Sequence, residues 1–264
     1  MKQRMTMLIL SCDKFSDLWD GHVKLLEQNW PDRNMDTIIV TDKQRQVSYP
    51  NVNVFAAGEE LEWSERLEKV LESISTDYVF LTLDDYYLIK KVNTESINNL
   101  LNLMEEKNLD YIRLFKRPTK ATREEISECK GVFKIEPGSK YSVNLYSGIW
   151  RKKFLSACIC EPMNAWQFEV NLPGEAVKYG AECAVSLNKD FEILDVVRKG
   201  KLLHHSYYYF MRHPGIYNGS RPTNTWGYEI RLGIKTVVGR YTPKPIHNAI
   251  RNVMKRFGYQ FYSD

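Results

Sequence analysis

The chain has 264 residues, of which 43% are hydrophobic and 27% charged, and this composition suits a globular protein with one large α/β domain or a domain plus an appendage. No apolar run approaches the roughly 20 residues that a transmembrane helix needs, and the N-terminal apolar stretch is too short for a signal peptide. Five cysteines, an odd number without disulfide-like spacing, favour a reducing, cytoplasmic setting.

The formal net charge of +4 is unevenly distributed along the chain. Residues 198–264 contain 12 Lys and Arg but 2 Asp and Glu, whereas residues 1–197 contain 25 basic and 31 acidic residues. A basic, tyrosine-rich tail on a mildly acidic body indicates an anionic partner such as a phosphate, a nucleic acid or a membrane surface. The sequence contains no recognisable nucleic-acid-binding motif, and the acidic body argues against nucleic acid.

In the first half of the chain, hydrophobic periodicity predicts strands that alternate with helices. The expected strands are residues 5–12, 36–41, 52–57, 78–83 and 110–115. The expected helices follow Ser16, span 63–75, and begin after Asn93 or Thr94. This order of elements argues for a mostly parallel sheet that is covered by helices.

The second half is less regular. Residues 117–140 are polar and broken by Gly and Pro, so we expect a mobile excursion there. A strand at 141–150, helices from 151 and at 164–172, and a strand at 190–197 follow. A loop-rich region then leads to a candidate basic amphipathic helix at 245–257. We therefore expect one domain over 1–205 and, over 206–264, a basic extension that packs on the domain or on a membrane surface.

Two adjacent carboxylates follow the apolar strand 78–83. Like charges repel unless a cation or hydrogen-bond donors compensate them, and Asp84 and Asp85 stand where open α/β sheets bind their ligands, at a strand's carboxyl end. Mg²⁺ and Mn²⁺ prefer carboxylate oxygens and keep positions open for substrate phosphates. The pair therefore predicts a site, although an Asp-rich turn that merely ends the strand remains the alternative.

Four segments carry a resemblance to a known family. "ILSCDKFSDLW", "SERLEKVLESISTDYVFLTLDDYYLI", "YSVNLYSGIWRKKFL" and "NAWQFEV", in this order, resemble bacterial glycosyltransferases of the GT-A fold that build capsule, O-antigen and other surface polysaccharides. The resemblance covers about residues 5–205. It implies a Rossmann-like GT-A fold, a nucleotide-sugar donor, and a glycan or lipid-linked glycan acceptor. The family's Asp-x-Asp element is reduced here to Leu83-Asp84-Asp85.

For the donor, the resemblance implies that Asp85 contacts a divalent metal, Mn²⁺ or Mg²⁺, while Asp84 holds the ribose or a metal-bound water. It also implies that the end of the first strand, Ser11, Cys12 and Asp13, lies against the nucleotide. Asp13 is equally compatible with a solvated loop carboxylate.

Arg66 interrupts the otherwise ordinary amphipathic pattern of the helix at 63–75. The resemblance suggests that Arg66 faces the nucleotide or Asp84. The alternative is a surface ion pair with Glu62, four residues earlier.

Glycosyl transfer requires that a base remove the proton of the acceptor hydroxyl. Glu169 stands between Trp166 and Phe168, and partial desolvation there would raise its pKa toward that of a useful base. The resemblance suggests that Glu169 is this base in an inverting, single-displacement enzyme, whereas an exposed helical glutamate is the alternative. Tyr146, Trp150 and Trp166 offer faces on which acceptor sugars can stack, although each alone is more often a core aromatic.

The segment "RKGKLLHHSYYYFMRH" concentrates positive charge and histidines. By the resemblance, His204 or His205 stabilises the leaving diphosphate; a solvated basic loop is the alternative. The basic stretch 240–257 suggests peripheral contact with an anionic membrane, at the inner face of the plasma membrane, or else a helix packed on the body.

Two other functions compete with sugar transfer. A non-catalytic nucleotide- or carbohydrate-binding module with a degenerate GT-A fold would explain the incomplete Asp-x-Asp element. Nucleotidyl transfer also uses paired aspartates and metal, but it would normally call for a glycine-rich phosphate loop or a further well-placed carboxylate, and neither is evident in the sequence.

Overall fold

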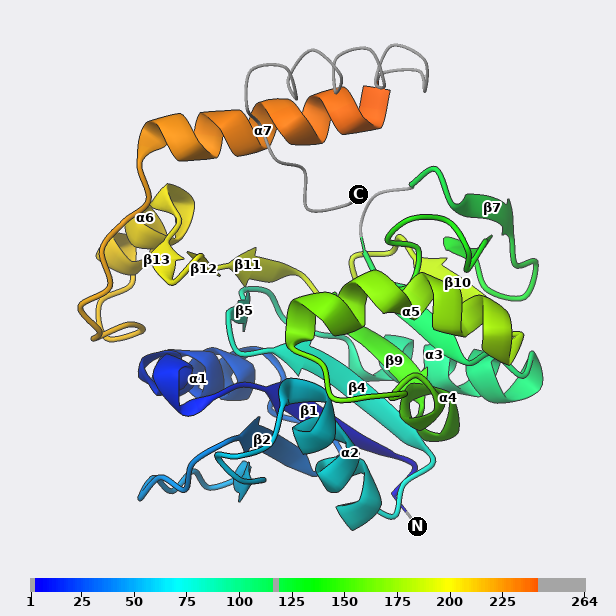
Figure 1. Ribbon diagram of the computed structural model, residues 1–264, viewed down its shortest axis with the longest axis horizontal. Helices are drawn as coiled ribbons and strands as arrows, with labels where there is room; N and C mark the ends of the chain where they lie inside the picture. Colours follow the sequence, from blue (N-terminus) through cyan, green and yellow to red (C-terminus); the bar gives the residue numbers. More distant parts are fainter. Residues whose placement is uncertain (1–2, 116–118, 242–264) are drawn as a thin grey trace.

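A nine-stranded sheet forms the centre of the protein in the computed structural model, which describes residues 3–115 and 119–241 (Figure 1). The strand order is β3-β2-β1-β4-β9-β6-β10-β8-β7. The strands are β1 (Met5–Leu10), β2 (Thr37–Thr41), β3 (Asn53–Ala56), β4 (Tyr78–Leu83), β6 (Tyr111–Leu114), β7 (Thr122–Glu125), β8 (Val132–Ile135), β9 (Gly148–Arg151) and β10 (Cys183–Ser186). Only β8 and β9 run against the direction of the others. The expectation of a mostly parallel central sheet flanked by helices is therefore confirmed.

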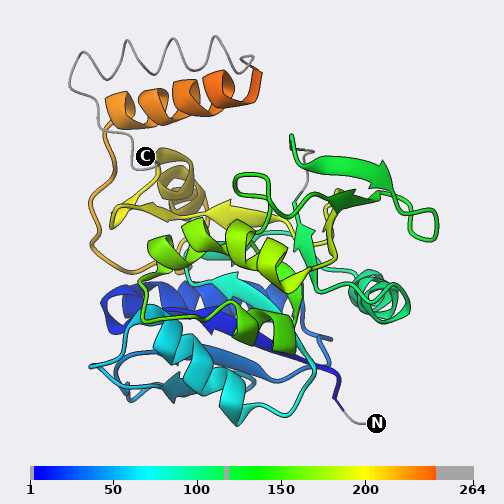
Figure 2. The same ribbon diagram turned by 45° about the vertical axis from the view of Figure 1, so that its right-hand side comes forward.

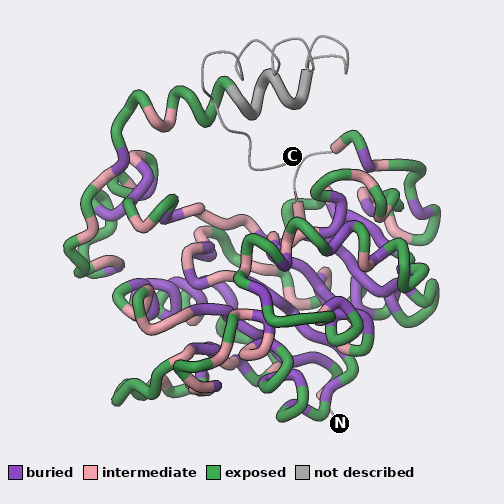
Figure 3. Tube along the Cα trace, in the orientation of Figure 1, coloured by how far each residue is buried: buried purple, intermediate pink, exposed green. Residues whose placement is uncertain are grey.

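Helices cover both faces of this sheet (Figures 1 and 2). The helices of the described chain are η1 (Asp13–Leu18), α1 (Trp19–Asn29), α2 (Trp63–Ser73), α3 (Thr94–Glu106), α4 (Lys152–Ala157), α5 (Ala165–Tyr179), α6 (His204–Arg212) and α7 (Trp226–Tyr241), of which α1 to α5 pack on the sheet. Successive side chains of a strand point to opposite faces, so Met7 and Ile9 of β1 pack with α1 and α3, whereas Leu8 and Leu10 pack with α2, α4 and α5. The central strands are consequently buried on both sides (Figure 3).

The start of the first helical segment differs from the prediction. Ser16 does not cap a helix; it lies within the 3-10 helix η1, and α1 follows with Leu18 at its N-cap position and no side-chain cap. The predicted apolar face is nevertheless correct, because Trp19, Val23, Leu26 and Trp30 are all buried. Asn93 caps α3 by accepting hydrogen bonds from two backbone amides.

The prediction of an excursion at 117–140 is wrong for its described part. Strands β7 and β8 form a hairpin there, and β8 pairs with β10 to extend the sheet. The short strand β5 (Tyr86–Leu88) and strand β10 were also not predicted. Strand β5 pairs with β11 (Ile193–Asp195) in a separate two-stranded sheet, and β12 (Val197–Arg198) pairs with β13 (Lys201–Leu202).

The C-terminal part of the described chain is continuous with the body. The division expected after residue 205 falls inside α6, whose Phe210 packs in a cluster with Leu18, Tyr87 and Val197. Helix α7 stands away from the sheet layers in both ribbon views (Figures 1 and 2). No helix in the described ranges has both the length and the apolar character needed to cross a membrane. The candidate helix at 245–257 lies outside the described residues.

Candidate functional site

The ends of three parallel strands meet at one edge of the sheet. Strand β1 leads into Ser11–Asp13, β2 into Asp42, and β4 into Asp84 and Asp85. The chain passes from β1 outward through β2 to β3 and then returns to place β4 on the other side of β1. Such a reversal of strand order is where open α/β sheets bind ligands, outside the carboxyl ends of the strands.

Asp84 is held rigidly by its neighbours from the first strand and helix. Ser11 Oγ donates a hydrogen bond to Asp84 Oδ2, and Trp19 Nε1 donates to Ser11 Oγ at 2.7 Å. The His22 ring lies with Nδ1 3.1 Å from the Asp84 carbonyl oxygen, and burial lowers the pKa of His22 to about 4, so this imidazole is neutral. Burial raises the pKa of Asp84 to about 7, against the opposing effects of the Ser11 hydrogen bond and the positive charge of Arg221.

Asp85 has an oxygen that is available to a cation. Its Oδ1 atom is buried and has no hydrogen-bond partner within the described part of the chain. Burial, followed by the negative charges of Asp84 and Asp195, raises the pKa of Asp85 well above its usual range, while Arg198 acts in the opposite direction. A carboxylate oxygen without a donor suits a divalent cation.

The described ranges contain no group of three or more His, Cys, Asp or Glu side chains arranged to hold a metal ion. Mg²⁺ is commonly bound by one or two carboxylates together with substrate phosphates. The residues present fit an ion held in that way, with Asp85 as a protein ligand.

Two aspartates that were not predicted also line this edge. Asp195 ends β11 opposite Tyr86; Arg198 Nη2 donates to its Oδ2 at 2.6 Å, and its Oδ1 is buried without a partner among the described residues. Asp42 accepts the Asp13 amide at 2.5 Å. For Asp42 the available signal was the same as for Asp84, namely an acidic residue directly after an apolar strand, whereas Asp195 lies within the predicted strand 190–197.

The first-strand residues and Arg66 are grouped around Asp42. The Asp13 carboxylate pairs with Arg45, and burial and the charges of Asp84 and Asp42 raise the pKa of Cys12. Arg66 Nη1 lies 4.0 Å from Asp42 Oδ2 and donates to the Leu61 carbonyl at 3.2 Å. Arg66 thus turns toward the ends of β1 and β2, and its ion pair is with Asp42.

Glu169 faces the same region from α5. Its Oε1 accepts the Leu145 amide at 3.3 Å, and burial raises its pKa, with the Leu145 hydrogen bond and the charge of Arg198 opposing. Burial raises the pKa of Tyr86 well above its usual range, and the charges of Asp85, Asp195 and Glu169 add to this effect. Glu169 and the two aspartates therefore share one electrostatic environment around Tyr86.

The three aromatic residues predicted to bind the acceptor have different surroundings. The Tyr146 ring centroid lies 5.3 Å from that of Tyr86, beside the carboxylates, and Trp166 on α5 is 49% exposed. Trp150 is fully buried, with its ring centroid 4.2 Å from that of Tyr111. An interpretation of Trp150 as a sugar platform does not fit this burial, because β9 lies in the middle of the sheet and points Trp150 into the core.

The adjacent histidines have separate roles in the fold. His204 Nδ1 lies 2.8 Å from Glu229 Oε1, and its ring stacks on Trp226 with a centroid separation of 3.8 Å, so His204 connects α6 to α7. His205 Nε2 lies 2.7 Å from the Asp195 carbonyl oxygen. Of the two, His205 is the one beside the carboxylate-lined edge.

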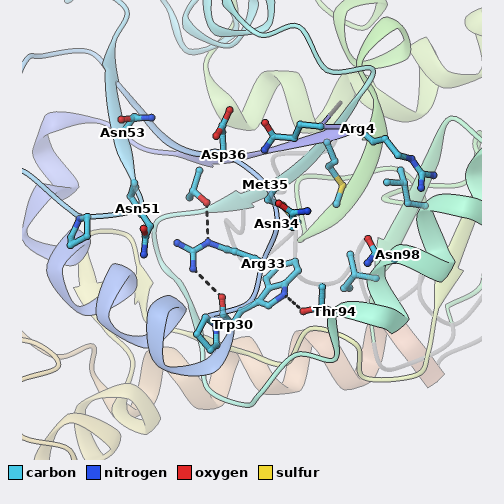
Figure 4. Close-up of a pocket in the computed structure, with 18 of the residues that line it drawn as sticks. Arg4, Trp30, Arg33, Asn34, Met35, Asp36, Asn51, Asn53, Thr94 and Asn98 are labelled. Atoms are coloured by element: carbon cyan, nitrogen blue, oxygen red, sulfur yellow. Dashed lines mark hydrogen bonds between the residues drawn. The ribbon is translucent and has the colours of Figure 1, made fainter. Parts of the chain in front are cut away.

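A cavity of about 810 Å³ lies at the opposite, amino-terminal ends of β1 and β2 (Figure 4). Its buried cation, Arg33, is bonded to Glu27, to Thr37 Oγ1 at 3.0 Å and to the Trp30 carbonyl at 3.0 Å. That guanidinium is satisfied within the chain, whereas the carboxylates at the other end of the strands include Asp85, which has an unsatisfied buried oxygen among the described residues, so we take that end as the candidate site.

Comparisons with known proteins yield distant structural matches. No protein-family model matches the chain, and no curated protein matches its sequence. S. aureus TarS aligns over 80% of this chain and 39% of its own, with 14% identity and a TM-score of 0.49. A UDP-glucose pyrophosphorylase solved with UDP-glucose aligns over 73% and 92%, with 9% identity and a TM-score of 0.49. A cytidylyltransferase from Leptospira borgpetersenii aligns over 84% and 100%, with 10% identity and a TM-score of 0.46. Matches this distant say nothing about activity, and the chain spans less than two thirds of TarS.

Proposed function

We propose that the protein is a glycosyltransferase that moves a sugar from a nucleotide-sugar donor to a glycan or lipid-linked glycan acceptor. The observation that carries this proposal is the convergence of Ser11–Asp13, Asp42, Asp84 and Asp85 at the reversal of strand order. Glu169 accepts the Leu145 amide, and the ring of the next residue, Tyr146, packs on Tyr86, which directly follows Asp85. The donor diphosphate would lie beside Asp85, together with a divalent cation that would offset the phosphate charge.

On the acceptor side, Glu169 would remove the proton of the attacking hydroxyl. The Leu145 amide orients its Oε1 atom, and its burial-raised pKa brings the carboxylate closer to the working range of a general base. The hydroxyl oxygen forms a bond to the anomeric carbon as the bond to the diphosphate breaks, so the configuration inverts. Arg198 would stabilise the negative charge that develops on the leaving group.

A ligand screen tests the donor class. The full chain is heated with nucleoside diphosphates and their sugars, with and without Mn²⁺, beginning with UDP and UDP-GlcNAc, the ligands with which TarS has been solved. We expect one nucleotide family to raise the melting temperature in a metal-dependent way, and Asp85→Ala to abolish that increase. No increase with any nucleotide would refute the proposal.

Turnover separates the glycosyltransferase from a non-catalytic module. Asp85→Ala and Glu169→Ala should each abolish sugar transfer while the fold, followed by circular dichroism, is retained. If both variants transfer sugar at the wild-type rate, neither residue has the proposed role. A pyrophosphate product would instead identify nucleotidyl transfer.

A further inference from the structure

Arg113 is a buried cation whose side chain is only partly satisfied. It lies in β6 and is 2% exposed. Its Nη1 donates to the Tyr141 carbonyl oxygen at 3.1 Å, whereas Nε and Nη2 are buried and have no hydrogen-bond partner among the described residues. The guanidinium carbon lies 5.3 Å from the centre of the Phe115 ring. The contrast with Arg33, which bonds a carboxylate, a hydroxyl and a carbonyl, is clear.

No carboxylate of the described chain forms an ion pair with Arg113, and its one hydrogen bond among these residues is to a carbonyl oxygen. Outside the described residues, the sequence contains one acidic side chain, Asp264. Burial lowers the pKa of Arg113, but a guanidinium stays protonated in proteins, so its charge persists. A buried charge without a counter-charge is costly, so the unsatisfied donors of Arg113 require an explanation.

The two orphaned atoms form one edge of the guanidinium. Nε–H and Nη2–H point the same way and match the two oxygens of a carboxylate or a phosphate in a bidentate pair. Nη1, which is bonded to Tyr141, belongs to the other edge. The geometry of the unsatisfied donors therefore specifies an oxyanion rather than a single neutral acceptor.

The loop at 141–147 joins Arg113 to the proposed catalytic base. Its Tyr141 carbonyl accepts from Arg113, and its Leu145 amide donates to Glu169. The Tyr146 ring lies between that of Phe115, at a centroid distance of 4.8 Å, and that of Tyr86, at 5.3 Å. A chain of contacts through this loop thus connects Arg113 to Glu169 and to Tyr86, which directly follows Asp85.

We propose that Arg113 binds an anionic group of the acceptor, a carboxylate or a phosphate, through its Nε and Nη2 edge. This inference rests on the proposed function, in which Glu169 faces the acceptor. The loop at 141–147 covers the guanidinium in this structure and must move for the anion to enter. Tyr141 has a φ of 57°, in the left-handed region that bulky residues seldom adopt.

Anion binding by the full chain tests the proposal without sugar transfer. Melting temperatures are measured in a chloride buffer and after addition of inorganic phosphate, glucuronate or glucose, at constant ionic strength. The proteins are the wild type, Arg113→Met, Arg113→Lys and, as a matched control, Arg231→Met, which removes an exposed arginine of α7.

Phosphate or glucuronate, at about 100 times its Kd, should raise the melting temperature of the wild type and of Arg231→Met by roughly 5 to 10 °C. Glucose should have no effect. Arg113→Met should not respond, and without anion it should be at least as stable as the wild type, because an uncompensated charge has been removed. Arg113→Lys keeps the charge but loses the bidentate Nε and Nη2 donors. It should therefore fold, and its melting temperature should rise only slightly with the anion. The anion that raises the melting temperature shows whether the acceptor group is a phosphate or a carboxylate.

Three results would overturn the proposal. The first is an equal response in wild type and Arg113→Met, which would place the anion elsewhere. The second is no response of the wild type to either anion. The third is a large loss of stability in both Arg113 variants while their folded fraction still responds to the anion. That result would show that Arg113 only stabilises the core. Because the nucleotide screen is a separate measurement, an anion response without nucleotide binding would refute the glycosyltransferase and leave the anion site standing.

Discussion

Replacement of Asp84 by asparagine should stabilise the protein at alkaline pH. Burial raises the pKa of Asp84 from an ordinary 3.8 to about 7, a difference of about 3 pKa units. At about 1.4 kcal/mol for each unit, the ionised carboxylate makes the folded state about 4 kcal/mol less stable at pH 8 than a neutral group would. Asparagine removes this cost and can still accept the hydrogen bond from Ser11.

The sign of the pH dependence follows from the raised pKa. In the wild type, this contribution to stability is fully present below pH 3.8 and is lost as the pH rises through about 7. Between pH 5 and pH 8, the free energy of unfolding should fall by roughly 2 to 3 kcal/mol from this group alone. In Asp84→Asn that fall should disappear. The pKa of Asp85 should also move down toward its usual range, because a neighbouring negative charge has been removed.

Urea unfolding at pH 5, 6, 7 and 8 measures this effect. Asp77→Asn is the control, because it removes one negative charge from an exposed position at the opposite end of β4. The two variants should differ in their pH profiles and agree in their m-values. If Asp84→Asn followed the wild-type profile, or were less stable than the wild type at pH 8, the assignment of burial as the dominant effect on Asp84 would be wrong.

Three further predictions concern catalysis, packing and the C-terminal helix. Glu169→Gln should lower kcat by at least about 100-fold with little change in nucleotide affinity. In the wild type, kcat/KM should rise with pH as Glu169 ionises, at a pKa above its usual range. If the variant kept its kcat, Glu169 would be excluded as the base. In urea unfolding, Trp150→Ala should cost about 3–5 kcal/mol, whereas Trp166→Ala, at a half-exposed position, should cost clearly less, and equal losses would contradict the burial of Trp150. His204→Ala should speed hydrogen exchange of the α7 amides and His205→Ala should not; identical exchange would show that His204 does not hold α7.

Elements with a dense apolar pattern were predictable from sequence. The predicted strand at 78–83 has the same bounds as β4, and Asn93 proved to be the cap of α3. The hairpin of β7 and β8 was not predictable, because "TREE" of β7 has no apolar alternation and resembles a polar loop. Strand β5 was missed because its three residues follow Asp84 and Asp85 without a turn signal and pair with a strand about 100 residues later.

The candidate site was predictable only where local pattern carries the information. Asp84 and Asp85 stand out because two charges follow an apolar strand. Asp195 became visible only through the pairing of β11 with β5, and Arg113 only through the burial of β6 between β9 and β10. Which strands become neighbours is decided by long-range packing, for which a single sequence holds no local signal.

Strand β7 gives the sheet an edge that resists joining another sheet. Arg123, Glu124 and Glu125 are exposed along it, and Arg123 and Glu124 pair with Glu136 and Lys134. A second chain that added a strand here would have to strip water from these charges before it gained a single backbone hydrogen bond. The same charged residues that give β7 no apolar alternation thus protect the folded protein from edge-to-edge aggregation. Their replacement by threonine or valine would leave an aggregation-prone edge strand.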